Sequence, residues 1–350
     1  MYKPRFTINN AILKHIGTIE AAREIILSAP LLPAWEKRFR EDAIVRTVHH
    51  GTHIEGNELN RDEAEKVMKG QDIVGRARDI QEVINYRNVL NYIENLGKES
   101  KEKQFNEDIL KKIHTLTTEN ILAKEKSGQI RTTQVVIKNS ATGEVTFRPP
   151  SSLEVPYQLK DLFAWLNGLS RDDIHSVLKS GIIHYEIVRI HPFVDGNGRV
   201  ARALSTLSLM WDEYDIRRFF SLEEYYDNDA ERYYGALQTA ISGDLTKWLV
   251  YFSEGLAIEL TRIKERIQKL STDISFKHKL GGKPVYLQER QIQMIEYMQQ
   301  MGYIQNQTFR ELFPGVSEDT ILRDLHDLIK KGIIKKEGKT KAARYILKSS

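Results

Sequence analysis

Apolar residues recur three or four positions apart along much of the chain, which is the spacing of helices that bury one face. This spacing predicts a succession of helices from about residue 13 to residue 96, with residues 60–63 offering an N-terminal cap for one of them. Residues 174–190 are apolar on nearly all sides, so we expect a buried helix there, capped by residues 170–173. Residues 199–210 lack Gly and Pro and predict another helix. The pattern indicates a mainly α fold.

One helix of the N-terminal series is expected to end in a carboxylate. Ile44 and Val48 lie four positions apart on its apolar face, and the same stripe continues to Thr52 and Glu55. Gly56 follows, and glycine often terminates helices because it adopts the left-handed conformation without steric cost. The inner face of this helix therefore leads to the carboxylate of Glu55.

Two β-rich runs interrupt the helical pattern between residues 128 and 150. They flank a polar turn that contains Thr142 and Gly143, so we expect a β-hairpin. The first run includes three β-branched residues, Val135, Val136 and Ile137. An exposed edge of such a hairpin could bind an extended peptide through main-chain hydrogen bonds. The alternative is a hairpin that faces solvent and has no partner.

A different pattern follows a hinge at residues 281–284. Three helices and then two short strands are predicted, at residues 287–298, 308–312, 317–329, 333–334 and 345–347. This order resembles a winged helix-turn-helix domain. We therefore divide the chain into an N-terminal helical region, a central core, a linker and a small C-terminal winged-helix domain, with the boundaries 1–105, 106–270, 271–284 and 285–350.

The C-terminal region carries much of the positive charge. From residue 283 onward there are 12 Lys and Arg against 8 Asp and Glu, an excess equal to the net charge of +4 for the whole chain. Five basic residues gather at the wing and could contact phosphates: Lys335, Lys336, Lys339, Lys341 and Arg344. The candidate recognition helix instead mixes Arg323 with Asp319, Asp324 and Asp327. DNA binding stays open, and the mixed face favours an interaction module or one that forms a homodimer.

The composition is that of an ordinary soluble globular chain, with 350 residues, 41% hydrophobic and 29% charged. There is no cysteine, so the chain has no disulfide framework and suits a reducing cytoplasm. The amino terminus lacks the apolar core of a signal peptide, and no run approaches the roughly 18 apolar residues of a membrane span. We expect a cytoplasmic protein without a membrane partner.

The strongest chemical signal is the stretch from His191 to Arg199, which reads His-Pro-Phe-Val-Asp-Gly-Asn-Gly-Arg. Gly196 and Gly198 have no Cβ, so several backbone N–H groups can converge on a ligand. The loop leads directly into a predicted helix, and unpaired N–H groups at a helix N-terminus bind anions. These features predict an anion site.

The charged residues of the same stretch fit a metal-bound triphosphate. Arg199 and Arg202 lie three positions apart on one helix face and can reach successive phosphates. Asp195 is placed to bind magnesium together with phosphate oxygens. The imidazole of His191 is available as a general base near neutral pH. The chemistry is therefore phosphoryl or nucleotidyl transfer, although no P-loop and no dinucleotide fingerprint occurs.

Residues 191–202 resemble the signature of the Fic family, His-Pro-Phe-x-Asp/Glu-Gly-Asn-Gly-Arg-x-x-Arg, at every fixed position. The resemblance implies a Fic helical core with a β-hairpin flap. It also implies a protein adenylyltransferase, which transfers AMP from ATP to a Ser, Thr or Tyr hydroxyl of a target protein and releases pyrophosphate. The identity of the target does not follow from the resemblance.

The resemblance also assigns roles to individual residues. His191 would be the general base and Asp195 the magnesium ligand. The α-phosphate would lie against Asn197 and the backbone amides of Gly196 and Gly198, and the outer phosphates against Arg199 and Arg202. Gly198 favours adenylate transfer, because relatives that phosphorylate their targets tend to carry Lys there. Val135, Val136 and Ile137 would lie in the flap that holds the target segment.

Residues 51–56 resemble the inhibitory motif of Fic proteins, Ser/Thr-x-x-x-Glu-Gly/Asn. The chain departs from the motif at Gly51, where the family prefers Ser or Thr, although Thr52 follows. By this resemblance Glu55 would pair with Arg202 and displace the γ-phosphate of the nucleotide. Some relatives use this glutamate to remove AMP, so Glu55 could instead orient a hydrolytic water.

Three alternatives accompany this interpretation. The chain could act chiefly as a hydrolase that removes AMP, or as a DNA-binding regulator whose Fic core senses nucleotide. His49 and His53 lie four positions apart and could share a structural zinc ion, although no third ligand is evident.

Overall fold

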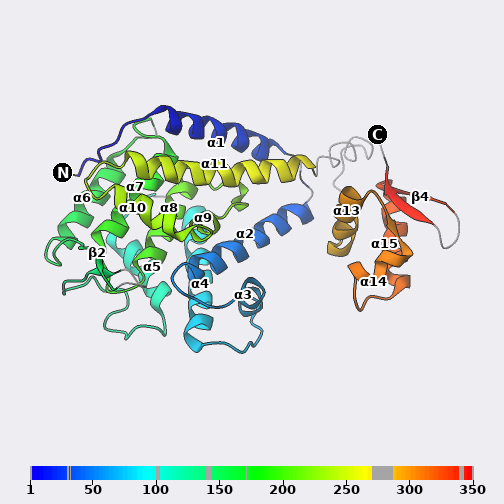
Figure 1. Cartoon of the computed structure of the whole chain (residues 1–350), viewed down its shortest axis with the longest axis horizontal. Coiled ribbons are helices and arrows are strands. Elements are labelled where there is room, and N and C mark those ends of the chain that lie inside the picture. Colours follow the sequence, from blue (N-terminus) through cyan, green and yellow to red (C-terminus); the bar gives the residue numbers. More distant parts are fainter. Residues whose placement is uncertain are drawn as a thin grey trace. The chain divides into compact units, whose positions relative to one another are not determined.

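The computed structural model describes residues 2–29, 31, 33–99, 103–138, 143–170, 172–269, 287–338 and 343–348. The chain divides into two compact units: unit 1 is Met1–Glu24 with Asp42–Arg262, and unit 2 is Ile25–Glu41 with Ile263–Ser350. Helices predominate (Figure 1), which confirms the predicted mainly α fold. The linker predicted at residues 271–284 lies entirely outside the described residues, and the predicted domain boundaries stay predictions.

The N-terminal part of the chain forms the predicted succession of helices, α1 (Asn10–Ser28), α2 (Pro33–His53), α3 (Arg61–Met68) and α4 (Ala77–Glu99). The expected cap at residues 60–63 is present at α3. There the Asn60 side chain accepts from the Glu63 N–H, and the Glu63 side chain accepts from the Asn60 N–H.

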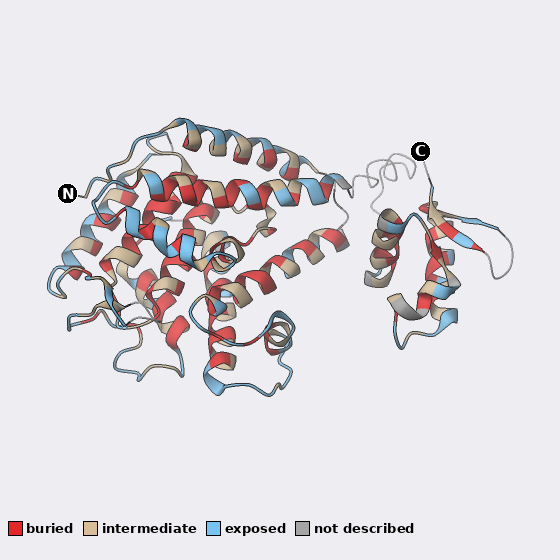
Figure 2. Cartoon of the chain, viewed as in Figure 1, coloured by how far each residue is buried: buried red, intermediate tan, exposed pale blue. Residues whose placement is uncertain are grey.

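The rest of unit 1 surrounds two central helices, α7 (Ser176–Ile190) and α8 (Asn197–Trp211). The helices that follow the chain around them are α5 (Glu107–Thr118), α6 (Val155–Gly168), the 3-10 turn η1 (Ile216–Arg218), α9 (Leu222–Asp227), α10 (Ala230–Thr239) and α11 (Thr246–Lys269). Figure 2 shows that buried positions occupy the inward faces of the helices, and most residues of α7 and α8 are buried. Small residues allow α7 and α8 to approach closely. At the contact, the hydroxyl groups of Ser180 and Ser205 each donate to the backbone carbonyl of the other residue.

The N-terminus of α7 corrects one prediction. Residues 170–173 do not cap the helix, because the Asp173 carboxylate accepts from the Ser170 N–H (2.7 Å) and closes a separate turn. The helix begins at Ser176 instead, and His175 caps it by accepting from the Val177 N–H through Nδ1 (3.3 Å). A Ser-x-x-Asp sequence can satisfy its own backbone without starting a helix.

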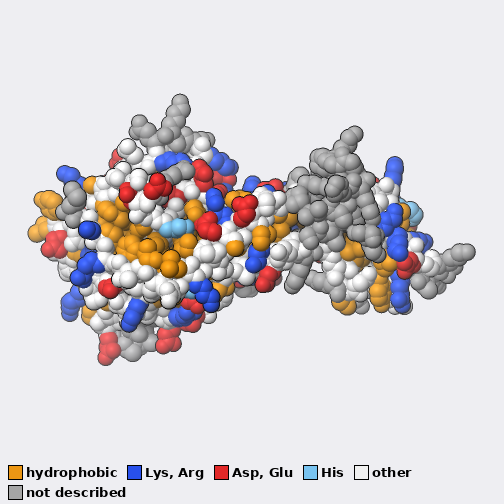
Figure 3. Space-filling view, turned by 90° about the horizontal axis from the view of Figure 1, so that it is seen from above, with side chains coloured by type: hydrophobic (Ala, Val, Ile, Leu, Met, Phe, Trp, Pro, Cys, Tyr) orange, Lys and Arg blue, Asp and Glu red, His pale blue; other side chains and the backbone are white. Residues whose placement is uncertain are grey.

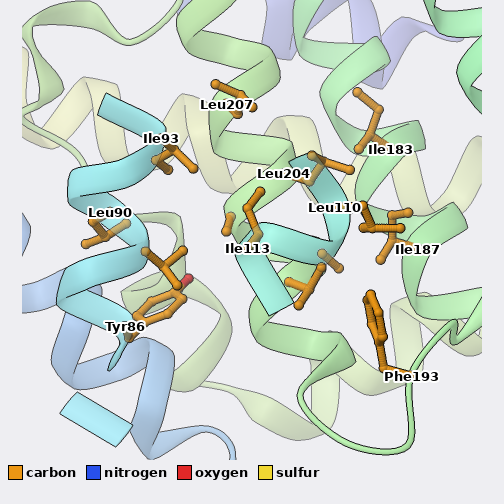
Figure 4. Close-up of a cluster of buried hydrophobic side chains, with 14 of the residues drawn as sticks. Tyr86, Leu90, Ile93, Leu110, Ile113, Ile183, Ile187, Phe193, Leu204 and Leu207 are labelled. Atoms are coloured by element: carbon orange, nitrogen blue, oxygen red, sulfur yellow. The ribbon is translucent and has the colours of Figure 1, made fainter. Parts of the chain in front are cut away.

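One hydrophobic core joins four of these helices to the loop after α7. Figure 4 shows the side chains that meet there: Tyr86, Leu90 and Ile93 from α4, Leu110 and Ile113 from α5, Ile183 and Ile187 from α7, Leu204 and Leu207 from α8, and Phe193 from the loop. Phe193 is fully buried. Burial of such a ring contributes about 1.5–3 kcal/mol, so the loop is anchored to the core at this point.

A two-stranded antiparallel hairpin lies where the β-rich runs predicted it. Its strands are β1 (Ile137–Lys138) and β2 (Val145–Phe147), and Ile137 pairs with Phe147. The residues at the predicted turn are described only from Gly143 onward, and Thr142 lies outside the described residues. Val135 and Val136 precede β1 and are half-buried, as is Ile137.

Unit 2 contains the three predicted C-terminal helices, α13 (Glu289–Met301), α14 (Phe309–Leu312) and α15 (Glu318–Lys330). Ser317 caps α15, as expected, by accepting from the Thr320 N–H. On the predicted inner face of α15, three side chains are buried and Ile329 is half-buried; the three are Ile321, Leu325 and Leu328.

The wing of unit 2 has one strand more than predicted. The described sheet is antiparallel, in the order β3 (Ile304–Gln305), β5 (Arg344–Leu347) and β4 (Ile334–Glu337), and the 3-10 turn η2 (Asn306–Thr308) follows β3. A strand of two residues is too short to show an alternating pattern. Lys339 and Lys341 lie outside the described residues.

Helices α1 and α11 form one face of unit 1. Figure 3 shows this face, on which hydrophobic side chains gather in one area. Leu13 on α1 and Ile258 on α11 are each about half exposed. Apolar surface of this kind is typical of interfaces, and the expected homodimer stays a prediction. None of the helices in the described part of the chain combines the length and low polarity that crossing a bilayer requires.

Candidate active site

The imidazole of His191 lies at the point where α7 gives way to the loop. His191 has a left-handed backbone (φ 51°), and its N–H still donates to the Ile187 carbonyl (3.0 Å). Its Nδ1 lies 3.2 Å from the Val188 carbonyl oxygen. Because a carbonyl can only accept, Nδ1 carries the proton in this contact, and the neutral ring keeps a lone pair on Nε2. Burial lowers the pKa of His191, with Arg131 adding to the effect, so the ring is neutral at pH 7.

Arg131 fixes the start of the loop, and the sequence analysis did not find it. Its side chain is buried and donates to the carbonyls of His191 (2.7 Å), Pro150 (2.6 Å) and Thr133 (3.1 Å). Its backbone N–H donates to the Pro192 carbonyl (2.9 Å). A guanidinium has five donors in a rigid fork, so this one residue ties the base of the hairpin to the catalytic loop. A lone arginine in a β-rich run gives no sequence signal of this role.

His114 on α5 supports the middle of the loop. Its ring stacks on Phe193, with the centroids 3.8 Å apart. Nδ1 accepts from the Gly128 N–H (2.8 Å), so Nε2 carries the proton and donates to the Asp195 carbonyl (3.0 Å). Burial lowers the pKa of His114 to about 4. The neutral ring therefore acts as a fixed spacer between α5 and the loop.

Asn197 closes the loop onto itself. Its Oδ1 accepts from the Phe193 N–H and its Nδ2 donates to the Phe193 carbonyl, both at 2.9 Å. Both ends of the amide are thus engaged within the loop, and the contact with an α-phosphate stays a prediction for this residue. Gly196 precedes it with φ +78°, a conformation that favours glycine, and α8 begins immediately afterwards.

Arg199 and Arg202 project from the first two turns of α8 and are both buried. Arg199 lies 3.2 Å from Glu82 and 3.8 Å from Asp195. Arg202 donates to the Gly51 carbonyl (2.9 Å) and to the Glu55 carboxylate (2.8 Å). Burial alone would lower the pKa of Arg202, but Glu55 together with Tyr233 and Tyr86 holds that pKa well above its ordinary value.

The Glu55 carboxylate lies over the first turn of α8. A Cβ placed on Gly198 would come within 3.0 Å of Glu55 Oε1, closer than real Cβ contacts. The missing side chain of Gly198 therefore makes the space that Glu55 occupies. A carboxylate thus stands where the helix N-terminus and Arg202 would otherwise face an anion.

Asp195 is the most accessible charged group of the loop, with 43% of its side chain exposed. Its Oδ1 accepts from the Gly196 N–H, and its other oxygen lies 3.4 Å from Arg78 on α4. A half-exposed carboxylate beside an anion site suits magnesium, which takes one or two carboxylates together with phosphate oxygens and water.

Comparison with known proteins agrees with this geometry. Residues 104–209 match the model of the Fic/DOC family. The chain contains a Fic/DOC family domain. Residues 290–338 match a DeoR-like helix-turn-helix domain, in agreement with the winged helix of unit 2.

The Fic domain has relatives among characterised proteins. The chain is 32% identical over 221 residues to protein adenylyltransferase fic-1 of Caenorhabditis elegans, covering 62% of this chain and 41% of the relative. It is 23% identical over 251 residues to protein adenylyltransferase Fic of Culex quinquefasciatus, covering 69% and 46%. The chain thus spans less than half the length of these two relatives.

Solved structures share the fold. A Fic family protein from Desulfovibrio desulfuricans aligns with a TM-score of 0.68 and 24% identity, over 100% of this chain and 99% of that one. A segment of Fic-1 from C. elegans aligns with a TM-score of 0.60 and 26% identity, over 74% and 73%.

The structure gives a packing reason for the glycine at position 51. A Cβ there would come within 3.0 Å of a ring carbon of buried Tyr86. The neighbouring Thr52 hydroxyl donates to the Val48 and His49 carbonyls, both at 3.0 Å, and so points into its own helix. The Thr52 carbonyl accepts from the Glu55 N–H (3.0 Å) and shapes the turn. An inhibitory contribution of Thr52 stays a prediction.

The histidines of α2 contact a single acid. Nδ1 of His50 lies 2.7 Å from an Asp227 oxygen, and Nδ1 of His53 lies 2.8 Å from the other. No group of three His, Asp or Glu side chains in the described residues is arranged to hold a metal ion. The arrangement does not support the zinc alternative with His49 and His53.

The base of the flap is held by side-chain hydrogen bonds to backbone. Gln134 donates to the Pro149 carbonyl (3.0 Å) and Ser152 to the Thr132 carbonyl (3.0 Å). In the described residues the hairpin itself is a sheet of two strands, β1 and β2. The docking of a target segment on Val135, Val136 and Ile137 stays a prediction.

Proposed function

We propose that the chain is a protein adenylyltransferase that transfers AMP from ATP to a Ser, Thr or Tyr hydroxyl of a target protein, and that Glu55 restrains it. The observation that carries the proposal is the position of the Glu55 carboxylate, 2.8 Å from Arg202 and in the space above Gly198. An intramolecular carboxylate at a helix N-terminus takes the place of an outer phosphate of ATP. The names of the relatives support the reaction class.

Proton transfer is assigned to His191. Because Nδ1 is engaged with Val188, the free lone pair on Nε2 accepts the hydroxyl proton of the target. The hydroxyl oxygen bonds to the α-phosphorus, and the bond from that phosphorus to the leaving oxygen breaks, which releases pyrophosphate. The low pKa of His191 keeps the ring in the form that accepts a proton.

The charge on the phosphates is met by the start of α8. Arg199 and Arg202 would bind the outer phosphates, and the N–H groups after Gly196 would face the α-phosphate. Asp195 would hold Mg2+, which neutralises charge on the phosphate oxygens when it is bound. These groups lie close together before any nucleotide binds, so catalysis would rely on positioning and electrostatics.

The decisive experiment compares the wild-type chain with Glu55→Gly, using ATP labelled on the α-phosphate and a cell lysate as the source of targets. We expect at least tenfold more label on protein with the variant, because Arg202 and the space above Gly198 become available to ATP. Glu58→Gly is the matched control, since Glu58 lies three residues on and pairs with Arg76 rather than with α8. Equal labelling by all three proteins would refute the restraint.

His191→Ala in the Glu55→Gly background tests the chemistry. Loss of a general base typically lowers the rate about 10^2- to 10^4-fold. We expect this loss of transfer with ATP binding retained, measured by calorimetry. Undiminished transfer would exclude His191 as the base.

AMP removal is the alternative role of Glu55. The carboxylate is 26% exposed and so is within reach of solvent, which a water-orienting residue requires. In that case Glu55→Gly would abolish hydrolysis of a target that already carries AMP. The same variant thus separates the two directions of the reaction.

For unit 2 we propose an interaction role, with DNA as the specific candidate to test. The match of residues 290–338 to a DeoR-like helix-turn-helix supports DNA binding. The exposed face of α15 does not, because Glu318 and Asp319 lie beside Arg323 there. Binding to random-sequence duplex that weakens steeply with salt would support a DNA role, and no binding at 50 mM salt would favour a protein partner.

A further inference from the structure

Two buried arginines at the proposed nucleotide site each face a carboxylate, but the two carboxylates are held differently. Among the described residues Glu55 makes one ion pair, with Arg202, and 26% of its side chain is exposed. Glu82 on α4 is only 5% exposed and lies 3.2 Å from both Arg199 and Arg78. Glu82 is therefore a fixed partner, whereas Glu55 reaches its partner from the surface.

The surroundings of Glu82 prevent it from leaving. Its second oxygen accepts from Asn57 Nδ2 (3.1 Å), and the same Nδ2 donates to the Asp79 carbonyl (3.0 Å). If Glu82 turned away, the buried guanidinium of Arg199 would lose its nearest counter-charge, and an uncompensated buried charge is strongly destabilising. These contacts hold the Glu82 carboxylate in one position.

The hydrogen bonds of Arg199 point to an absent ligand. Its Nε and Nη1 have no hydrogen-bond partner in the part of the chain that the structure describes, although the residue is only 3% exposed. Glu82 supplies charge from one side without a well-aligned hydrogen bond to these nitrogens. The donors of a buried arginine normally find acceptors, so we expect a ligand's oxygens to complete the set.

We propose that Glu82 is a positioning residue, which orients the guanidinium of Arg199 toward the outer phosphates of ATP. The proposal rests on the proposed function, because it takes ATP as the ligand of Arg199. Glu82 acts through Arg199 and does not itself touch the nucleotide. In this arrangement Glu55 is the removable carboxylate of the site and Glu82 the permanent one.

Asn57 extends this arrangement to the turn that carries Glu55. Its side chain is buried and bonded to Glu82, and its backbone N–H donates to the Thr52 carbonyl (3.3 Å). The backbone two residues after Glu55 is therefore held by the same carboxylate that orients Arg199. Glu55 can then be displaced by rotation of its own side chain, while the turn and Arg199 stay in place.

The test introduces Glu82→Gln into the Glu55→Gly chain and measures the binding of MgATP and of AMP by calorimetry. Gln keeps the volume and one acceptor oxygen but loses the charge. Loss of a negative charge alone would strengthen the binding of a polyphosphate, whereas loss of orientation weakens it. We expect MgATP to bind about tenfold more weakly and AMP, which lacks the outer phosphates, to bind within twofold of the parent. The KM for ATP should rise about tenfold with kcat changed less than threefold.

Two further variants separate positioning from general damage. Glu259→Gln removes another buried carboxylate, 3.1 Å from buried Arg46, and should leave the affinity for MgATP unchanged. In an Arg199→Gln background, Glu82→Gln should have no additional effect on MgATP affinity, since its action requires Arg199.

Unchanged or tighter MgATP binding by Glu82→Gln would overturn the proposal, as would equal weakening of MgATP and AMP. If Glu82→Gln in the otherwise wild-type chain raised AMP transfer to the level of Glu55→Gly, Glu82 would be a second restraint. That result would also overturn the proposal. If Glu55→Gly binds MgATP but transfers no AMP, the proposed function fails while the binding comparison still decides the role of Glu82. If it binds no MgATP, both fail.

Discussion

A single methyl group added at position 51 tests the packing between the end of α2 and Tyr86. In Gly51→Ala the new Cβ would lie within 3.0 Å of Cε1 of Tyr86, 3.1 Å from Cδ1 and 3.2 Å from Cγ of Glu223. Carbon atoms in contact normally lie about 3.5–4.0 Å apart, so the ring or the helix must move by about 1 Å. The ring is held, because Tyr86 is fully buried and its hydroxyl donates to Glu223 (3.0 Å).

The expected loss of stability follows from two opposing effects. Overpacking a core typically costs about 1–3 kcal/mol. Alanine in place of glycine inside a helix raises the free energy of unfolding by about 0.5–1 kcal/mol. The net result is a loss of up to about 2.5 kcal/mol, with a central value of about 1 kcal/mol, which lowers the midpoint of thermal unfolding by about 2–4 °C for a unit of this size.

Gly17→Ala is the matched control, since Gly17 also lies inside a helix, but an added Cβ would meet no atom of the described residues within 4 Å apart from its chain neighbours and its own helix backbone. Its unfolding midpoint should rise slightly. Circular dichroism during heating measures both variants. A further variant, Tyr86→Ala, should remove the penalty of Gly51→Ala because the clashing ring is gone. If Gly51→Ala is as stable as Gly17→Ala, the account of position 51 is wrong.

Two further predictions concern pH and magnesium. The pKa of His114 is about 4 in the folded protein and near 6.5 when unfolded, so the unfolded state binds the extra proton first as the pH falls. The free energy of unfolding, measured with urea, should therefore decline by up to about 3 kcal/mol from pH 6.5 toward pH 4. His114→Gln should flatten that decline, and an unchanged slope would argue against a buried neutral His114. Asp195→Ala in the Glu55→Gly chain should raise the magnesium concentration needed for half-maximal transfer about tenfold, assayed with labelled ATP; an unaltered requirement would place the ion elsewhere.

The loop after α7 could be predicted from the sequence because its functional residues are close together in the chain. Gly196, Gly198 and the two arginines lie within one short stretch, and the helix that follows is continuous in its pattern. The pairing of Glu55 with Arg202 spans 147 positions, so only the resemblance to a known motif could indicate it. The structure places the two side chains together as that resemblance implied.

The supporting residues could not be predicted, because their roles depend on what folding brings near them. Arg131, His114 and Glu82 are single polar residues in ordinary hairpin and helix sequence. Each becomes important only when its segment packs against the loop or α8. The cap expected at residues 170–173 failed for the same reason, since the sequence does not say which backbone N–H its carboxylate will meet.

Glu55 fills the space above Gly198, and the proposed function makes the Glu55 carboxylate and the outer phosphates of ATP alternative occupants of that space. One is tethered to the chain, so its local concentration is constant and does not depend on how much protein is present. The other is diffusible, so its share of the volume rises and falls with its supply. A side chain at position 198 would collide with the Glu55 carboxylate, so under the proposed function it would remove the tethered competitor from this space.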